Sequence, residues 1–153
     1  PLKVVHLAFR KSDIHHSLNG FGYLVAPSEK SQILGCLWSS SFFPGRAPEE
    51  MALLTVFMGG ASNPQIASES DVTAVSKAMQ EIAPILGLKS APTFESVTTY
   101  EKAIPQYNVG HRKKLDAIRT MEQNAPGFFV TGNFISGISV GDVIRQAQKS
   151  FRA

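Results

Sequence analysis

The chain has 153 residues, enough for one domain with a substantial core. Its hydrophobic fraction of 43% and charged fraction of 18% are typical of a globular protein. No apolar run approaches the roughly 20 residues of a membrane-spanning helix. The net charge is only +3, and the basic residues are scattered apart from Arg112-Lys113-Lys114, so nucleic-acid binding is not predicted.

Few residues are placed for side-chain catalysis. The single cysteine, Cys36, excludes an intrachain disulfide, fits a reducing compartment and lies in an apolar segment where a buried, unreactive thiol is expected. The four histidines, at positions 6, 15, 16 and 111, lack the spacing of metal ligands. Phosphate-binding loops and G-x-G-x-x-G are absent. We therefore nominate no catalytic residue and no metal site.

The first half of the sequence is expected to be rich in strands. Strands are predicted at Leu2–Phe9, Gly22–Ala26, Gln32–Trp38 and Ala52–Met58. The polar segment Lys11–Asn19 reads as a loop, and the turn Pro27–Lys30 would join the second and third strands in a hairpin. An antiparallel meander is the simplest arrangement of these strands.

The pattern then changes to helical spacing. Apolar residues at 72, 75, 79, 82 and 86 predict a helix, with Ser68 and Asp71 resembling a capping box. Pro84 is expected to end or kink this helix before Gly87. Phe94–Tyr100 is a further strand candidate.

The last third predicts helices around a short strand. Leu115, Ile118 and Met121 mark an amphipathic helix. Phe128–Thr131 reads as a short buried strand closed by Gly132, and a final helix starts near Val140 or Gly141. The predicted fold class is α+β: a mixed sheet with amphipathic helices that ends in a strand, a loop and a helix.

This ending is a candidate binding element. A glycine-bearing loop, Asn133–Ser139, precedes a helix whose first N–H groups lack partners and can hold a phosphate or a polar ring edge. Gly132, Gly137 and Gly141 permit close backbone approach. An ordinary strand-to-helix connection would show the same pattern.

Large apolar side chains gather in the strand-rich half, at positions 21, 24, 37, 38, 42, 43 and 57. A hydrophobic core explains most of them. Phe42 and Phe43, however, precede Pro44 in a segment that reads as a loop, which is unusual for a core. A pocket for a flat apolar ligand is the alternative.

Several strings, in this order, resemble the C-terminal part of the oxygen-dependent protoporphyrinogen oxidases, within the flavin amine oxidase superfamily. They are Gly20–Val25, Ile33–Ser40 followed by Phe43-Pro44, Phe57–Gly60, Ala103–His111, Gly132-Asn133 and Gly137–Val140. Together they span nearly the whole chain, and their order is more specific than any one string.

The resemblance implies a flavoenzyme that binds FAD non-covalently and oxidises protoporphyrinogen IX with oxygen. The family fold interleaves an FAD domain with a substrate domain and adds a membrane-associated helical domain. Residues 1–107 would belong to the substrate domain, and residues 108–153 would return to the FAD domain. A cytoplasmic location is expected, with membrane association left open.

The resemblance also assigns candidate residues. Gly132, Asn133, Ile138, Ser139 and Val140 would meet the flavin. Tyr100 stands where relatives often carry a tryptophan beside the flavin, a departure that leaves its role open. The tetrapyrrole pocket would be lined by Phe21, Leu24, Leu37 and Phe57.

The dinucleotide-binding fingerprint of the family is not in these 153 residues. We therefore expect the chain alone neither to hold FAD tightly nor to turn over substrate. A free-standing, non-catalytic domain that binds a hydrophobic ligand or a partner protein is the first alternative. Another FAD-dependent amine oxidase or desaturase is the second. Coproporphyrinogen as substrate, the physiological electron acceptor and the oligomeric state are left open.

Overall fold

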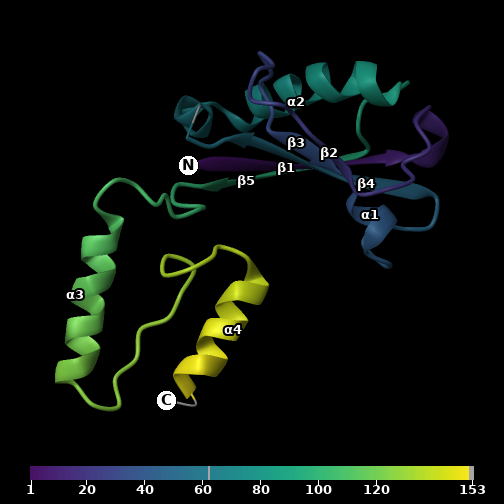
Figure 1. Cartoon of the computed structure of the whole chain (residues 1–153). Helices are drawn as coiled ribbons and strands as arrows, with labels where there is room; N and C mark the ends of the chain where they lie inside the picture. The colour runs from purple at the N-terminus through teal and green to yellow at the C-terminus, as the bar shows by residue number, and fades with distance from the viewer. Residues whose placement is uncertain (62, 152–153) are drawn as a thin grey trace. The chain divides into compact units, whose positions relative to one another are not determined.

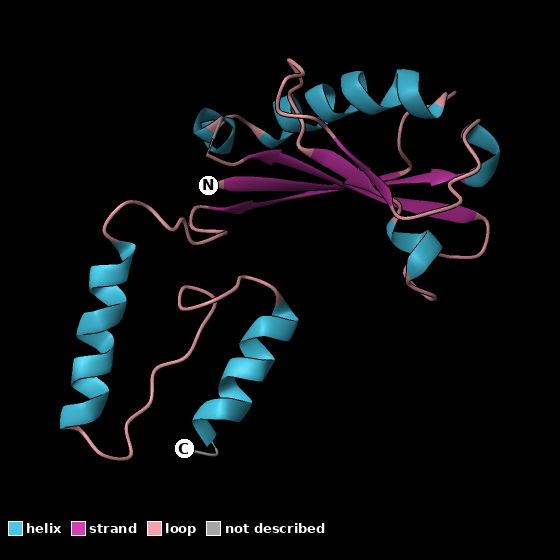
Figure 2. Cartoon of the chain, in the orientation of Figure 1, coloured by secondary structure: helices cyan, strands magenta, loops and turns pink. Residues whose placement is uncertain are grey.

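The computed structural model describes residues 1–61 and 63–151. They form two compact units, with the first spanning Pro1–Ala103 and the second starting at Ile104. The first unit contains the strands and the longest helix, and the second contains two helices and their connections (Figures 1 and 2). We describe each unit by itself.

A five-stranded antiparallel sheet forms the first unit. The strands are β1 (Leu2–Arg10), β2 (Gly22–Leu24), β3 (Gly35–Leu37), β4 (Met51–Gly59) and β5 (Phe94–Tyr100), in the spatial order β2-β3-β4-β1-β5. β1 pairs along its whole length with β4, from Leu2 opposite Gly59 to Arg10 opposite Met51. On its other side β1 pairs with β5. The first strand of the chain is therefore interior to the sheet.

The predicted hairpin between β2 and β3 is confirmed, and β4 follows as in a meander. The simple meander is wrong for β1, which lies between β4 and β5. β2 and β3 are also shorter than predicted, with three residues each. Pro27, which has no N–H to donate, follows β2 closely, so the ladder gives way to a turn.

Alternate residues of the strands build the core on one face of the sheet. Val5, Leu7 and Phe9 of β1 are fully buried, as are Leu54, Val56 and Met58 of β4. The helix α2 (Asp71–Leu86) covers this face, and its buried side chains are Ala74, Ala78, Ile82 and Leu86 (Figure 1). Cys36 lies in this core, where burial raises the pKa of its thiol to about 12. The predicted burial of this thiol is confirmed.

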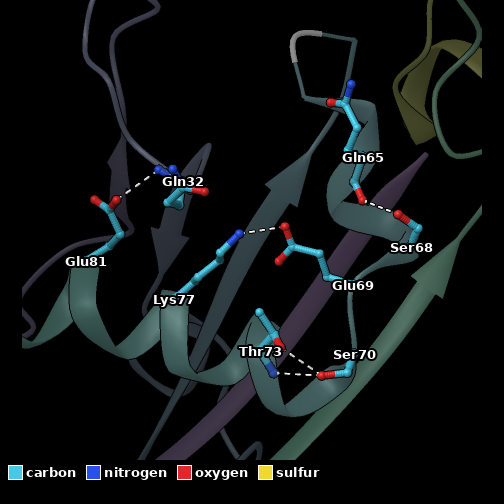
Figure 3. A network of polar contacts seen from close by, with 8 residues as sticks. All are labelled: Gln32, Gln65, Ser68, Glu69, Ser70, Thr73, Lys77 and Glu81. Carbon is cyan, nitrogen blue, oxygen red and sulfur yellow. Dashed lines mark hydrogen bonds and ion pairs between the residues drawn. The ribbon is translucent and has the colours of Figure 1, made fainter.

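The start of α2 differs from the prediction, whereas its end before Gly87 agrees with it. Ser70, not Ser68, caps the helix, because its hydroxyl accepts the backbone N–H of Thr73 at 3.1 Å. Ser68 instead donates to the carbonyl of Gln65 (Figure 3). Pro84 lies inside the last turn, and the helix continues to Leu86 before ending at Gly87.

Polar contacts attach α2 to the segments around it (Figure 3). Lys77 Nζ contacts the Glu69 carboxylate at 2.6 Å. One oxygen of Glu81 accepts the backbone N–H of Gln32, and the other accepts the Ser31 hydroxyl, both at 2.9 Å. The segment that leads into β3 is therefore held against the helix.

The second unit contains α3 (His111–Asn124) and α4 (Val140–Phe151), both at predicted positions. The predicted strand Phe128–Thr131 is wrong: the segment is irregular, and both of its phenylalanines are about half exposed. The backbone N–H of Val130 donates to the Glu122 carboxylate at 2.8 Å rather than to a neighbouring strand. Within residues 104–151 no side chain is fully buried.

No helix in the described part of the chain is long and apolar enough to cross a membrane.

We predict that the ion pair between the buried Lys3 of β1 and the exposed Asp71 of α2 contributes to stability. Lys3 is 3% exposed and its ammonium group lies 2.7 Å from a carboxylate oxygen of Asp71, which is 64% exposed. Asp71→Asn should lower the free energy of unfolding by about 1–2 kcal/mol, because it leaves a buried charge without its partner. Urea unfolding followed by the fluorescence of Trp38, the one tryptophan of the chain, measures this.

The double variant Lys3→Met/Asp71→Asn is the control. Replacing both charges removes the unpaired ammonium group, so its stability should return towards that of the original chain. Equal losses in the single and double variants would contradict the interpretation.

Candidate functional site

The sheet face opposite α2 carries three of the four predicted substrate residues. In the strand register, Leu24 lies opposite Gly35 and Gly35 opposite Phe57, so these positions form one row across the sheet. Leu37 lies two residues beyond Gly35 and therefore on the same face. We call this surface, defined by Leu24, Leu37 and Phe57, the open face.

Two glycines lie on the open face where β2 and β3 meet. Gly22 lies opposite Leu37, and Gly35 lies opposite Leu24. A Cβ atom on Gly35 would stand 2.4 Å from the carbonyl oxygen of Tyr23, so no larger residue fits there. Leu24 is 81% exposed, although it is a large apolar side chain in a strand. An exposed apolar side chain beside a glycine floor suits contact with a flat apolar ligand.

The fourth predicted substrate residue, Phe21, belongs to an aromatic cluster. Phe21 is 68% exposed and stacks on Phe42, with ring centroids 4.5 Å apart. Phe43 packs against Phe42 at 4.6 Å, and the Arg46 guanidinium lies 5.3 Å from the Phe43 ring centre. Phe42 closes the short helix α1 (Ser39–Phe42), which corrects the expected loop. Within the first unit, α1 lies on the side of the sheet opposite α2 (Figure 1).

In the second unit, the loop that carries the predicted flavin contacts is clamped by two aromatic side chains. The Tyr107 hydroxyl donates to the carbonyl of Asn133 at 2.7 Å and accepts the backbone N–H of Gly137 at 3.1 Å. His111 Nε2 lies 2.7 Å from the carbonyl of Phe134. The rings of Tyr107 and His111 stack at 4.7 Å. Neither residue was predicted as part of a site, although both lie in the string Ala103–His111.

The start of α4 is capped by a reciprocal pair. The Ser139 hydroxyl accepts the backbone N–H of Asp142 at 3.1 Å and donates to its carboxylate at 2.6 Å. This hydrogen bond, together with the Arg145 guanidinium, lowers the pKa of the Asp142 carboxyl group. The Val143 N–H donates to the Ser139 carbonyl. Of the first four N–H groups of α4, those of Val140 and Gly141 therefore stay open within the described residues.

Gly137 is required by its surroundings. Its φ of +105° is unfavourable for other residues, and a Cβ atom would stand 2.5 Å from an oxygen of the Asp142 carboxylate. The loop can therefore approach the start of α4 closely only because glycine is present.

Three of the predicted flavin residues line one hollow of about 380 Å³, which is formed by Asn133, Ile138, Val140, Val143 and Ile144. Val143 and Ile144 were not predicted, although helical spacing from Val140 could have indicated Ile144. Gly132 and Ser139 flank the hollow in the chain without lining it. Apolar walls beside open N–H donors fit the edge of a flat heteroaromatic ring, so the residues present are compatible with a flavin. Tyr100 belongs to the first unit, and its role stays a prediction.

Comparisons with known proteins identify the family to which this chain is similar. The family described as flavin containing amine oxidoreductase matches residues 1–150. The mitochondrial protoporphyrinogen oxidase of Nicotiana tabacum is 38% identical over 148 residues, which cover 94% of this chain and 29% of the relative. Coproporphyrinogen III oxidase of Bacillus subtilis (strain 168) is 26% identical over 145 residues, covering 94% of this chain and 31% of the relative.

Solved structures show the same fold. One is a protein from Exiguobacterium sp. 255-15 that is provisionally assigned as a protoporphyrinogen oxidase. It superposes with a TM-score of 0.77 at 22% sequence identity, and the superposition covers 99% of this chain and 33% of the Exiguobacterium chain. Reduced UDP-galactopyranose mutase superposes with a TM-score of 0.68 at 13% sequence identity, and the superposition covers 87% of this chain and 28% of the mutase chain.

The chain thus spans about three tenths of the length of the curated relatives it matches. The match to the family covers both units, including the open face and the loop before α4. The resemblance seen in the sequence is confirmed, and the chain belongs to the flavin-containing amine oxidoreductase family.

Proposed function

We propose that these residues are the C-terminal part of an FAD-dependent oxidase that converts protoporphyrinogen IX to protoporphyrin IX with oxygen. The observation that carries this proposal is the convergence of Leu24, Leu37 and Phe57 on the sheet face opposite α2, where the short helix α1 packs over Thr55. A porphyrinogen is a broad apolar macrocycle, and such a ligand is bound mainly by apolar side chains. The Nicotiana tabacum relative, which is named for this activity, supports the same substrate.

The second unit would hold the flavin ring through the hollow at the start of α4. Asn133, Ile138 and Val140 line it, and the open N–H groups of Val140 and Gly141 would favour negative charge on the ring. The flavin would supply the redox chemistry. The chain's own part is to position the ring and to exclude water from one of its edges.

We further propose that this chain alone neither retains FAD nor turns over substrate. It spans 29% of the tobacco relative, and the described residues of its second unit contain no fully buried side chain. A flavin site without a buried core around it lacks the rigidity that cofactor binding needs. Membrane association and a cytoplasmic location remain predictions.

Coproporphyrinogen III is a second candidate substrate, favoured by the Bacillus subtilis relative. It carries additional carboxylate groups but the same apolar macrocycle. Parallel turnover assays of the full-length protein with both porphyrinogens distinguish them, and a clear preference for coproporphyrinogen would replace our first choice.

Leu24→Ala should lower kcat/KM of the full-length protein for protoporphyrinogen IX about tenfold, because it removes apolar contact area from the open face. Since Leu24 is largely exposed, the urea midpoint should barely change. Val72→Ala is the matched control, because Val72 is 77% exposed on α2, which covers the other face of the sheet. Equal activities of the two variants would argue against the open face as the substrate site.

Tyr107→Phe should reduce the FAD retained by the purified full-length protein. The substitution keeps the ring but removes both hydrogen bonds that hold Asn133 and Gly137. Absorbance of bound flavin per protein measures the effect. Tyr23→Phe is the control, since the buried Tyr23 hydroxyl has no hydrogen-bond partner within residues 1–61 and 63–151, and its removal should leave flavin content unchanged. Unchanged flavin in Tyr107→Phe would contradict the clamp.

Gly137→Ala should reduce the flavin content of the full-length protein more than Tyr107→Phe does, because the added methyl group collides with the Asp142 carboxylate. Gly127→Ala is the control: Gly127 also has a positive φ, +86°, but a Cβ atom there meets nothing within 4 Å. Both variants therefore carry similar backbone strain, and only Gly137→Ala displaces the start of α4. Similar flavin contents would show that strain rather than the collision determines the outcome.

A further inference from the structure

One polar side chain stands within the apolar open face. His6 of β1 lies opposite Thr55 of β4, two residues along from Val4, which lies opposite Phe57. Thr55 in turn lies opposite Leu37 of β3. Because side chains alternate along strands, His6 projects from the same face as Leu24, Leu37 and Phe57. Its side chain is partly exposed there.

His6 is the end of a short chain of hydrogen bonds. Its Nδ1 atom lies 3.0 Å from the Thr55 hydroxyl oxygen, which lies 2.7 Å from the Ser39 hydroxyl oxygen of α1. Thr55 is only 6% exposed, but Ser39 already provides a partner for its hydroxyl. The histidine is therefore not needed to satisfy a buried group.

The other ring nitrogen of His6, Nε2, makes no hydrogen bond with residues 1–61 or 63–151. The two hydroxyl groups can both reverse their direction of donation. If Ser39 donates to Thr55 and Thr55 to Nδ1, then Nε2 carries the proton and donates. If the direction reverses, Nδ1 carries the proton and Nε2 accepts. This arrangement offers a ligand either a donor or an acceptor at one fixed place.

A tetrapyrrole has the matching chemistry. Every inner nitrogen of the reduced macrocycle is an N–H donor, and the saturated carbons between its pyrrole rings let these N–H groups tilt towards one face. In the planar oxidised macrocycle the inner nitrogens point at the ring centre and offer no comparable hydrogen bond to a side chain above the face. We propose that His6 is a positioning and specificity residue that accepts, through Nε2, a hydrogen bond from the pyrrole N–H groups of the reduced macrocycle lying on the open face. This proposal rests on the proposed function, because it assumes a tetrapyrrole on that face.

The test uses steady-state turnover of protoporphyrinogen IX by the full-length protein that carries these residues, followed by the fluorescence of the porphyrin formed. His6→Leu should raise KM about three- to tenfold with little change in kcat, as expected for the loss of one hydrogen bond. His6→Gln should stay within about twofold of the original protein, because its amide oxygen can also accept. His15→Leu, which removes an imidazole from an exposed position outside the open face, should leave KM unchanged.

The outcomes separate the two proposals. If the original protein does not oxidise protoporphyrinogen IX, the proposed function fails. If it does, and Leu24→Ala lowers kcat/KM while His6→Leu leaves KM unchanged, only the inference about His6 fails. Equal increases in KM for His6→Leu and His6→Gln, with unchanged urea midpoints, would also overturn it, because the effect would then be steric.

Discussion

The pairing of β1 with two neighbours is the interaction on which the first unit depends. Residues 2–10 join residues 51–59 on one side and residues 94–100 on the other. This pairing fixes which side chains face α2 and which face the opposite side, since a shift by one residue would exchange the two sets. The buried core and the open face are thus two results of one register. Lys3 and Asp71 add a charged contact between β1 and α2 that holds the helix on its face.

Helices and long strands could be predicted from the sequence, because their periodicity extends over many residues. Short segments could not. Phe128–Thr131 has the apolar composition of a buried strand, but a strand also needs a partner, and Glu122 takes the N–H of Val130. Ser68 and Ser70 are equally good caps by composition, and only the position of Thr73 decides between them. Composition alone leaves such choices to tertiary contacts.

The candidate sites also divide into features that the sequence predicts and features that depend on tertiary contacts. The resemblance named Leu24, Leu37 and Phe57, but their common face follows from the register across three strands, which no local pattern specifies. His6, Tyr107 and His111 were missed for the same reason. Each acts through a residue distant in sequence: Thr55 for His6, Asn133 for Tyr107 and Phe134 for His111. Long-range hydrogen bonds leave no trace in hydrophobic periodicity.

The two candidate sites achieve order by different physical means. The open face belongs to a sheet whose other face is buried under α2, so its side chains project from a backbone that the core already fixes. The loop before α4 has no such support among the described residues, and its shape depends on individual hydrogen bonds from Tyr107, His111 and Gln146. Each such bond contributes only about 1 kcal/mol. A ligand that contacts the open face therefore meets a surface formed in advance, whereas a ligand at α4 must supply part of the order itself, and its affinity will be the more sensitive to single substitutions.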